Sequence, residues 1–151
     1  MPMPWTYRHA SREFRAFLDD VKDATGLVSD NSAYTAVDGV FRTFRRRLTV
    51  EEAIAVAQVL PSVPRAMFVQ DWDPAEAPVA FTDRASLTRE AQALRPHHNL
   101  TPDNAIEATA RAVWRAVDHL AFDRVLDRLP HDARAFWTVD APPEDLAQRI
   151  R

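Results

Sequence analysis

The chain has 151 residues, 46% of them hydrophobic, which is enough for one domain with its own core. It has no cysteine, which excludes disulfides and thiolate metal sites, and only two glycines, which exclude glycine-rich phosphate loops and dinucleotide fingerprints. The formal net charge of −3 favours neither a polyanionic nor a polycationic partner. The first residues lack a signal-peptide core and no apolar run approaches the roughly 20 residues that span a bilayer, so we expect a cytoplasmic protein without membrane contact.

Residues 11–70 form the first of two predicted helical units and follow an N-terminal extension of residues 1–10. Apolar residues recur at helical spacing from Phe14 to Phe68, and terminating residues divide them into four helices. Thr49 followed by Glu52 predicts a capping box, in which each side chain bonds the other residue's backbone amide. The predicted helix starts and ends lie at Ser11, Gly26, Asp30 or Asn31, Thr49, Pro61, and Ser62 with Pro64.

Residues 71–84, DWDPAEAPVAFTDR, break the helical pattern and are predicted to link the two units. They hold two prolines, and four acidic residues against one basic residue. We expect Trp72 and Phe81 to attach this linker to the core.

Residues 85–138 repeat the scheme of the first unit, and residues 139–151 form a C-terminal tail with a short helix predicted from Pro143. The predicted helix boundaries of the second unit lie at Asp83 or Ser86, Pro96, Thr101 with Pro102, Pro130 and Asp132. Trp114 lies on an apolar stripe, as Phe41 does in the first unit, and both are expected in the core. No segment alternates as a strand does. We predict an all-α fold, in which a tandem pair of homologous four-helix units packs as one compact helical domain.

The two units share a motif, VAQVLPSVPRAMF at residues 56–68 and VLDRLPHDARAFW at residues 125–137. A repeat of this length indicates two similar supersecondary units. In each copy a proline ends one helix, and Arg65 or Arg134 lies one turn into the next. We expect these arginines to bond the exposed carbonyl groups that end the preceding helix, or a nearby carboxylate. The alternative is that they bind an anion.

Residues 45–53 follow the pattern R-x-R-L-T-x-E-E-A, and Gln58, Leu60, Pro61, Arg65 and Trp72 come after it. These residues, with the Leu-Pro-x-x-x-Arg motif of the second unit, resemble the bacterial family called domain of unknown function 2267. The resemblance extends over about residues 10–138 and departs from the family at Asp71, where the family usually has glycine. It implies an all-helical fold and assigns no activity.

The only basic cluster consists of Arg42, Arg45, Arg46 and Arg47. The first three share a helical face that could contact phosphates. However, Asp38 precedes Arg42 by four residues and Glu51 follows Arg47 by four, spacings that suit ion pairs within a helix. We therefore interpret the cluster as a solvated, self-paired face, and nucleic-acid binding is disfavoured because the chain has no marked basic excess.

Histidines and nucleophiles do not form a recognisable reactive site. His97 and His98 lie beside Asp103, and His119 precedes Asp123 by four residues, but no Glu-x-x-His occurs. There is no Gly-x-Ser-x-Gly elbow, and the serines fall at predicted helix starts. We expect no metal, no cofactor and no catalytic residue.

We therefore predict a non-catalytic protein-binding or scaffolding module, acting on an unknown protein partner or as a homodimer. The alternative is a small-molecule or anion site in the crevice between the halves, lined by Arg65 or Arg134. A third, least favoured alternative is nucleic-acid binding through the face of Arg42. The candidate binding residues are Arg65, Arg134, Arg42, Arg45, Arg46 and Trp72.

Overall fold

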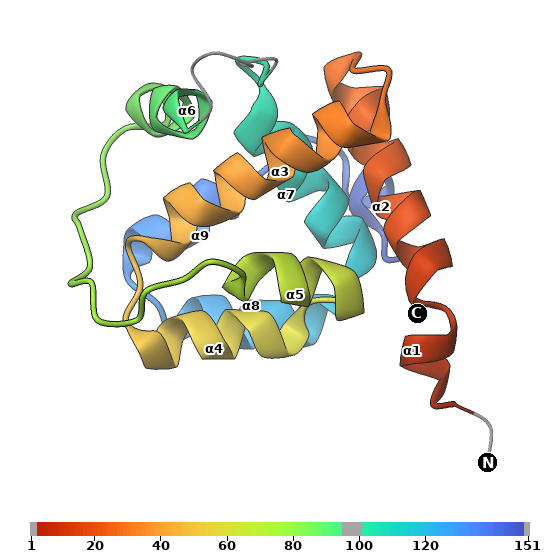
Figure 1. Ribbon diagram of the computed structural model, residues 1–151, viewed down its shortest axis with the longest axis horizontal. Coiled ribbons are helices and arrows are strands. Elements are labelled where there is room, and N and C mark those ends of the chain that lie inside the picture. The colour runs from red at the N-terminus through yellow and green to blue at the C-terminus, as the bar shows by residue number, and fades with distance from the viewer. Residues whose placement is uncertain (1–2, 95–100, 150–151) are drawn as a thin grey trace.

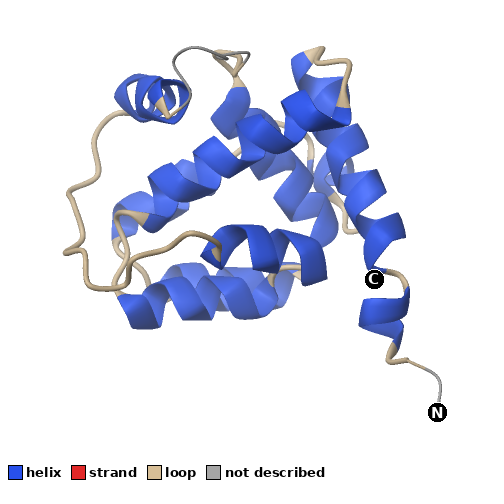
Figure 2. Cartoon of the chain, in the orientation of Figure 1, coloured by secondary structure: helices blue, strands red, loops and turns tan. Residues whose placement is uncertain are grey.

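The computed structural model describes residues 3–94 and 101–149, and over these residues it contains helices and loops but no β-strand (Figures 1 and 2). The predicted all-α class is therefore confirmed. The helices are α1 (Trp5–Arg8), α2 (Ala10–Thr25), α3 (Asp30–Arg45), α4 (Val50–Val59), α5 (Ser62–Val69), α6 (Arg84–Ala93), α7 (Ala105–Ala116), α8 (His119–Asp127), α9 (His131–Trp137) and the 3₁₀ turn η1 (Pro143–Leu146). None of the helices in the described part of the chain has the length and apolar character that a membrane span requires.

Local capping chemistry explains several helix ends. The Glu52 amide donates to Thr49 Oγ1 at 3.2 Å and the Thr49 amide donates to Glu52 Oε1 at 2.8 Å, which is the predicted capping box at the start of α4. Gly26 ends α2 with φ of 78°, a left-handed conformation that glycine adopts without strain. Asp83 accepts from the Ser86 amide and begins α6.

Four predicted helix starts are wrong. Ser29, rather than Asp30 or Asn31, caps α3 by accepting from the Ser32 amide at 3.0 Å. Helix α2 begins at Ala10 because α1 directly precedes it, so Ser11 has no capping role. Helix α7 begins at Ala105 instead of Pro102, after a turn in which the Asn104 side chain donates to the Ala24 carbonyl at the end of α2. Asp132 lies in the first turn of α9, and Pro130 occupies the N-cap position instead.

One hydrophobic core is built from both halves of the chain. The ring centroid of Phe44 in α3 lies 4.8 Å from that of Phe136 and 5.1 Å from that of Trp137, both in α9. Phe41 is buried as expected, whereas Trp114 is half-buried and its indole N–H donates to the Trp137 carbonyl at 2.7 Å. The shared core is therefore built from side chains that lie more than 80 positions apart in the sequence.

The helices pack across the two halves as well as within them. Helix α2 packs on α7, α3 on α6, and α4 on α8, with α3 running across the molecule between α2 and α6 (Figure 1). Helices α3 and α6 approach closely at Gly39, where a Cβ atom would lie 3.0 Å from the Ala91 carbonyl oxygen. The division into two homologous four-helix units stays a prediction.

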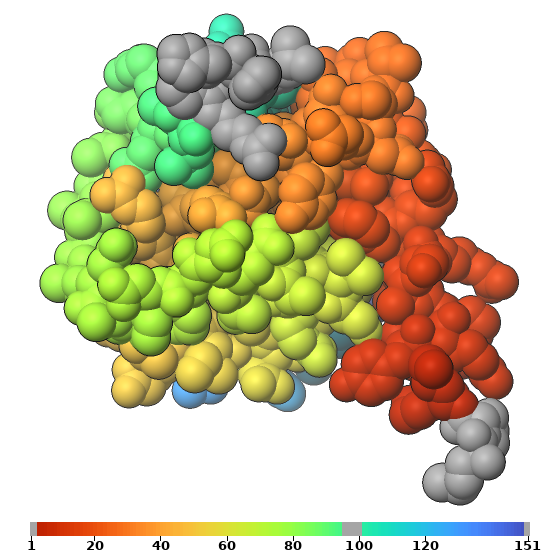
Figure 3. Space-filling model, viewed as in Figure 1, coloured from red at the N-terminus to blue at the C-terminus, as the bar shows by residue number. Residues whose placement is uncertain are grey.

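The linker crosses the outside of the molecule from α5 to α6 (Figure 1). Trp72 and Phe81 pack against the core, as predicted, and the Val79 amide donates to the Arg46 carbonyl at 3.0 Å. In Figure 3 its yellow-green atoms lie beside the orange atoms of α3. The acidic linker is thereby held against the C-terminal end of α3, where the arginine cluster lies.

Candidate binding site

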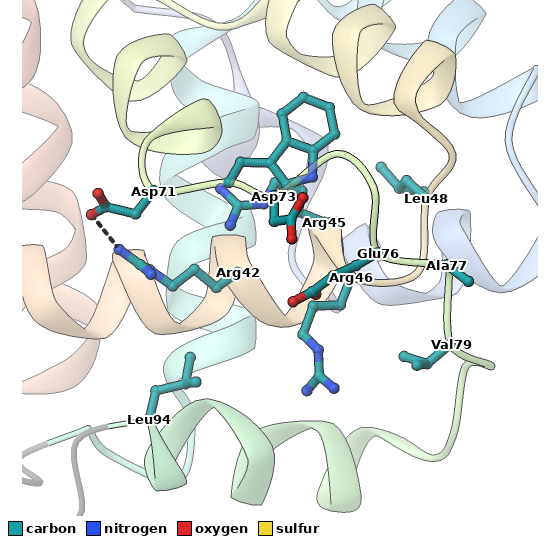
Figure 4. Close-up of a pocket in the computed structure, with 11 residues that line it drawn as sticks. Arg42, Arg45, Arg46, Leu48, Asp71, Asp73, Glu76, Ala77, Val79 and Leu94 are labelled. Atoms are coloured by element: carbon teal, nitrogen blue, oxygen red, sulfur yellow. Dashed lines mark hydrogen bonds and ion pairs between the residues drawn. The ribbon is translucent and has the colours of Figure 1, made fainter.

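Four of the six predicted binding residues line one cleft, with a volume of about 330 Å³, between the C-terminal end of α3 and the linker (Figure 4). Arg42, Arg45 and Arg46 come from the end of α3, and Trp72 comes from the linker. The linker also contributes Asp71, Asp73 and Glu76, and apolar parts of the wall are Leu48, Val79 and Leu94. The cleft therefore combines guanidinium groups, carboxylates and an indole.

Arg45 is a buried residue at the inner wall of this cleft. The prediction that it lies on a solvated face is therefore wrong. Its Nη1 donates to the carbonyls of Phe68 and Gln70, both at 2.9 Å, because the end of α5 packs against α3. Its guanidinium carbon lies 5.7 Å from the centre of the Trp72 ring. Nε is buried without a hydrogen-bond partner, and no hydrogen bond within the described residues reaches Nη2. Burial, followed by the nearby Arg42 charge, lowers the pKa of Arg45.

Arg42 is held by carboxylates on two sides. Its Nε donates to Asp38 at 3.0 Å, the ion pair predicted from their spacing. Its Nη2 donates to Asp71 at 3.1 Å, the bond drawn in Figure 4. Burial opposes the charge of Arg42, but the hydrogen bonds to Asp38 and Asp71 outweigh it and raise the pKa. Asp71 has φ of 51°, in the left-handed region that favours glycine. Its bond to Arg42 gives a physical reason for an aspartate at this position.

Arg46 and Arg47 both point toward α6. Arg47, with a side chain only 4% exposed, bonds both carboxylate oxygens of Glu90 and donates to the carbonyls of Thr43 and Ala80. Arg46 Nη1 lies 3.2 Å from the same Glu90. The hydrogen bond from Arg47 is the main cause that lowers the pKa of Glu90. The predicted pairing of Arg47 with Glu51 is wrong, because α3 ends before Arg47 and the chain turns into α4.

Asp73 and Glu76 are exposed, and within the described residues neither forms an ion pair. One oxygen of Asp73 accepts from the Ala75 amide at 3.0 Å, which fixes the turn of the linker. The sequence pattern assigned these two acidic residues to the linker and did not predict that they line a binding site. The opposite charges of the acidic linker and the basic cluster were the signal that could have predicted it.

Arg65 and Arg134 lie outside the cleft and contact helix ends, as predicted. Arg65 donates to the carbonyls of Ala57 and Leu60, both at 3.0 Å, at the end of α4. Arg134 bonds the carboxylates of Asp123 at 3.0 Å and Asp127 at 2.7 Å in α8. Both repeated arginines therefore bond the preceding helix, Arg65 through backbone carbonyls and Arg134 mainly through carboxylates, and the anion site suggested for them stays a prediction.

The histidines give no further site in the described residues. His97 and His98 lie outside these residues. His119 Nε2 lies 2.8 Å from the Trp114 carbonyl, and the two rings meet edge to face. In residues 3–94 and 101–149 no three histidine, aspartate or glutamate side chains are arranged to hold a metal ion.

The fold and the cleft define a small all-helical protein in which two Leu-Pro-x-x-x-Arg turns support a common core. The chain belongs to the family described as "Uncharacterized conserved protein (DUF2267)", whose model matches residues 14–136. The match extends from α2 into α9 and contains the whole linker and the arginine cluster. No curated protein matches the sequence.

Proposed function

We propose that the chain is a non-catalytic protein-binding module, and that the cleft at Arg45 and Trp72 holds a segment of a partner polypeptide. The observation that carries this proposal is that the guanidinium group of Arg45 has hydrogen-bond donors without a partner. Its Nη1 is bonded to two carbonyls and its Nε is fully buried, so Nη2, which has no hydrogen-bond partner within the described residues, is the donor left for a ligand. A donor left unpaired beside an open cleft and an aromatic ring favours a ligand that brings an acceptor.

The charges of the cleft indicate what else the ligand carries. Asp73 and Glu76 have no ion-pair partner in the described residues, so a lysine or arginine of the ligand would meet free carboxylates. The carboxylates that line the cleft equal its arginines in number, which disfavours nucleic acid because phosphates would meet both charges. A polypeptide with a main-chain carbonyl, a basic side chain and an apolar side chain fits this combination.

The N-terminal arm of a second copy has this chemistry and is the first partner to test. In α1 and the residue pair before it, Met3, Trp5 and Tyr7 are exposed, with Trp5 at 48% and Tyr7 at 55%. Arg8 and Arg12 are the charged residues of this arm, and the first acidic residue of the chain is Glu13. The arm is therefore basic and aromatic where the linker is acidic, which favours the homodimer among the partners we considered.

The test is fluorescence anisotropy with a labelled peptide of residues 3–12, MPWTYRHASR, within a panel of decapeptides that each carry at least one arginine or lysine next to an aromatic residue. We expect Asp73→Asn with Glu76→Gln to weaken binding about tenfold, equivalent to ~1.4 kcal/mol. Glu51→Gln with Glu144→Gln removes the same charge from exposed positions outside the cleft and should leave binding unchanged. If no peptide binds, or if both double variants weaken binding equally, the proposal is wrong.

A further inference from the structure

A second cleft, with a volume of about 360 Å³, lies between α2 and α7, where the two halves meet. The ionisable residues that line it are Asp20 and Asp23 from α2, and Glu107, Arg111 and Arg115 from α7. This is the kind of crevice in which a small-ligand site was predicted, but its arginines differ from those that the repeated motif suggested. It is separate from the cleft at Arg45.

Asp20 is a buried residue in the wall of this second cleft, with 5% of its surface exposed. One of its oxygens, Oδ1, accepts from Arg115 at 2.8 Å and from Arg149 of the C-terminal tail at 2.5 Å. The other oxygen, Oδ2, is buried without a hydrogen-bond partner. Because solvent does not reach Oδ2 and two arginines already bond Oδ1, Asp20 forms the closed inner wall of the cleft and leaves the ligand contacts to the other charged residues.

The cleft also contains unpaired charges of both signs. Asp23 and Glu107 are exposed, Arg111 is half-buried, and in the described residues none of the three forms an ion pair. Arg115 is already bonded to Asp20. The free charged groups are therefore the two carboxylates of Asp23 and Glu107 and the guanidinium of Arg111, which lies one helical turn, about 6 Å, from Arg115.

We infer that this cleft binds a free basic amino acid, a small molecule with two cationic groups and one carboxylate. The carboxylate pairs with Arg111, for which a bidentate geometry is available. The α-ammonium and the side-chain cation pair with Asp23 and Glu107, the two exposed carboxylates of the cleft. The volume of about 360 Å³ is at the small end of ligand sites, which suits a molecule of this size.

Isothermal titration calorimetry of the whole chain tests the inference with four probes. L-Lysine and L-arginine carry all three groups, cadaverine lacks the carboxylate, and 6-aminohexanoate lacks the α-ammonium. We expect both amino acids to bind at least tenfold more tightly than either comparator, since each comparator leaves one charge of the cleft unpaired. Absence of heat with L-lysine and L-arginine, or equal affinity for cadaverine, overturns the inference.

Arg111→Met is the matching variant, because it keeps the aliphatic stem and removes the guanidinium. It should weaken L-lysine binding to the level of cadaverine and leave cadaverine binding unchanged. Arg124→Met, at an exposed position in α8, is the control for net charge. If the two variants bind L-lysine equally well, the inference is overturned, and thermal melting of both confirms that the comparison is made on folded protein.

Discussion

Replacing Arg47 by methionine should lower the free energy of unfolding by about 3 kcal/mol. The Arg47 side chain is only 4% exposed and joins α3 to α6 through both oxygens of Glu90, and to the linker through the Ala80 carbonyl. Removing one partner of a buried ion pair costs roughly 3 to 5 kcal/mol. We expect the lower end, because Glu90 is 26% exposed and Arg46 still lies 3.2 Å from it.

Urea unfolding followed by circular dichroism measures this loss, with Arg124→Met as the control. The pH dependence is a second, independent readout. Because Arg47 lowers the pKa of Glu90 in the fold, the stability from Glu90 is fully present above its ordinary pKa of 4.5 and is lost as the pH falls through the lower folded pKa. Arg47→Met should therefore flatten the acid side of the stability curve. A stability within about 0.5 kcal/mol of the parent, or an unchanged acid profile, would refute the argument.

Two further predictions concern stability, and thermal or urea unfolding measures both. Arg65→Ala and Arg134→Ala should each lower the free energy of unfolding by about 1 to 3 kcal/mol, the usual effect of losing charge-assisted hydrogen bonds at a helix end, and wild-type stability of both variants would contradict it. Trp114→Ala should cost about 3 kcal/mol, the lower end for a large aromatic residue because Trp114 is half-buried. An unchanged melting temperature would show that this indole contributes no packing.

The parts of the fold that were predicted correctly depend on chemistry between neighbouring residues. The capping box of Thr49 and Glu52 and the left-handed Gly26 need only residues within one turn, so the sequence is sufficient to find them. The start of α7 was predicted three residues too early. Thr101 and Pro102 form a good local start signal, but Asn104 is drawn to the Ala24 carbonyl, 80 residues away.

The sequence predicted which residues form the candidate site, but it did not predict most of the contacts that these residues make. Arg42, Arg45, Arg46 and Trp72 do lie in one cleft, but the ion pairs were expected within one helix. Among the ion pairs that the described residues form with this cluster, the pair of Asp38 and Arg42 is the one that lies within a single helix. Glu90 lies 43 residues beyond Arg47, and the Phe68 carbonyl lies 23 residues beyond Arg45, so helical spacing contains no information about either contact.

The arginines of the cluster and the acidic residues of the linker differ in how much they contribute to the stability of the fold. Arg47 fastens α6 and the linker, and Arg45 uses one nitrogen to hold the end of α5, so a substitution at either changes stability together with any binding. Asp73 and Glu76 are exposed and lie on the opposite wall of the same cleft, where a neutral amide keeps the shape of the side chain. Stability and binding can therefore be separated in this protein by changing the linker acids and leaving the arginines in place. A loss of binding without a loss of stability in the Asp73 and Glu76 variants would assign the cleft a role in recognition that its part in holding the fold together does not explain.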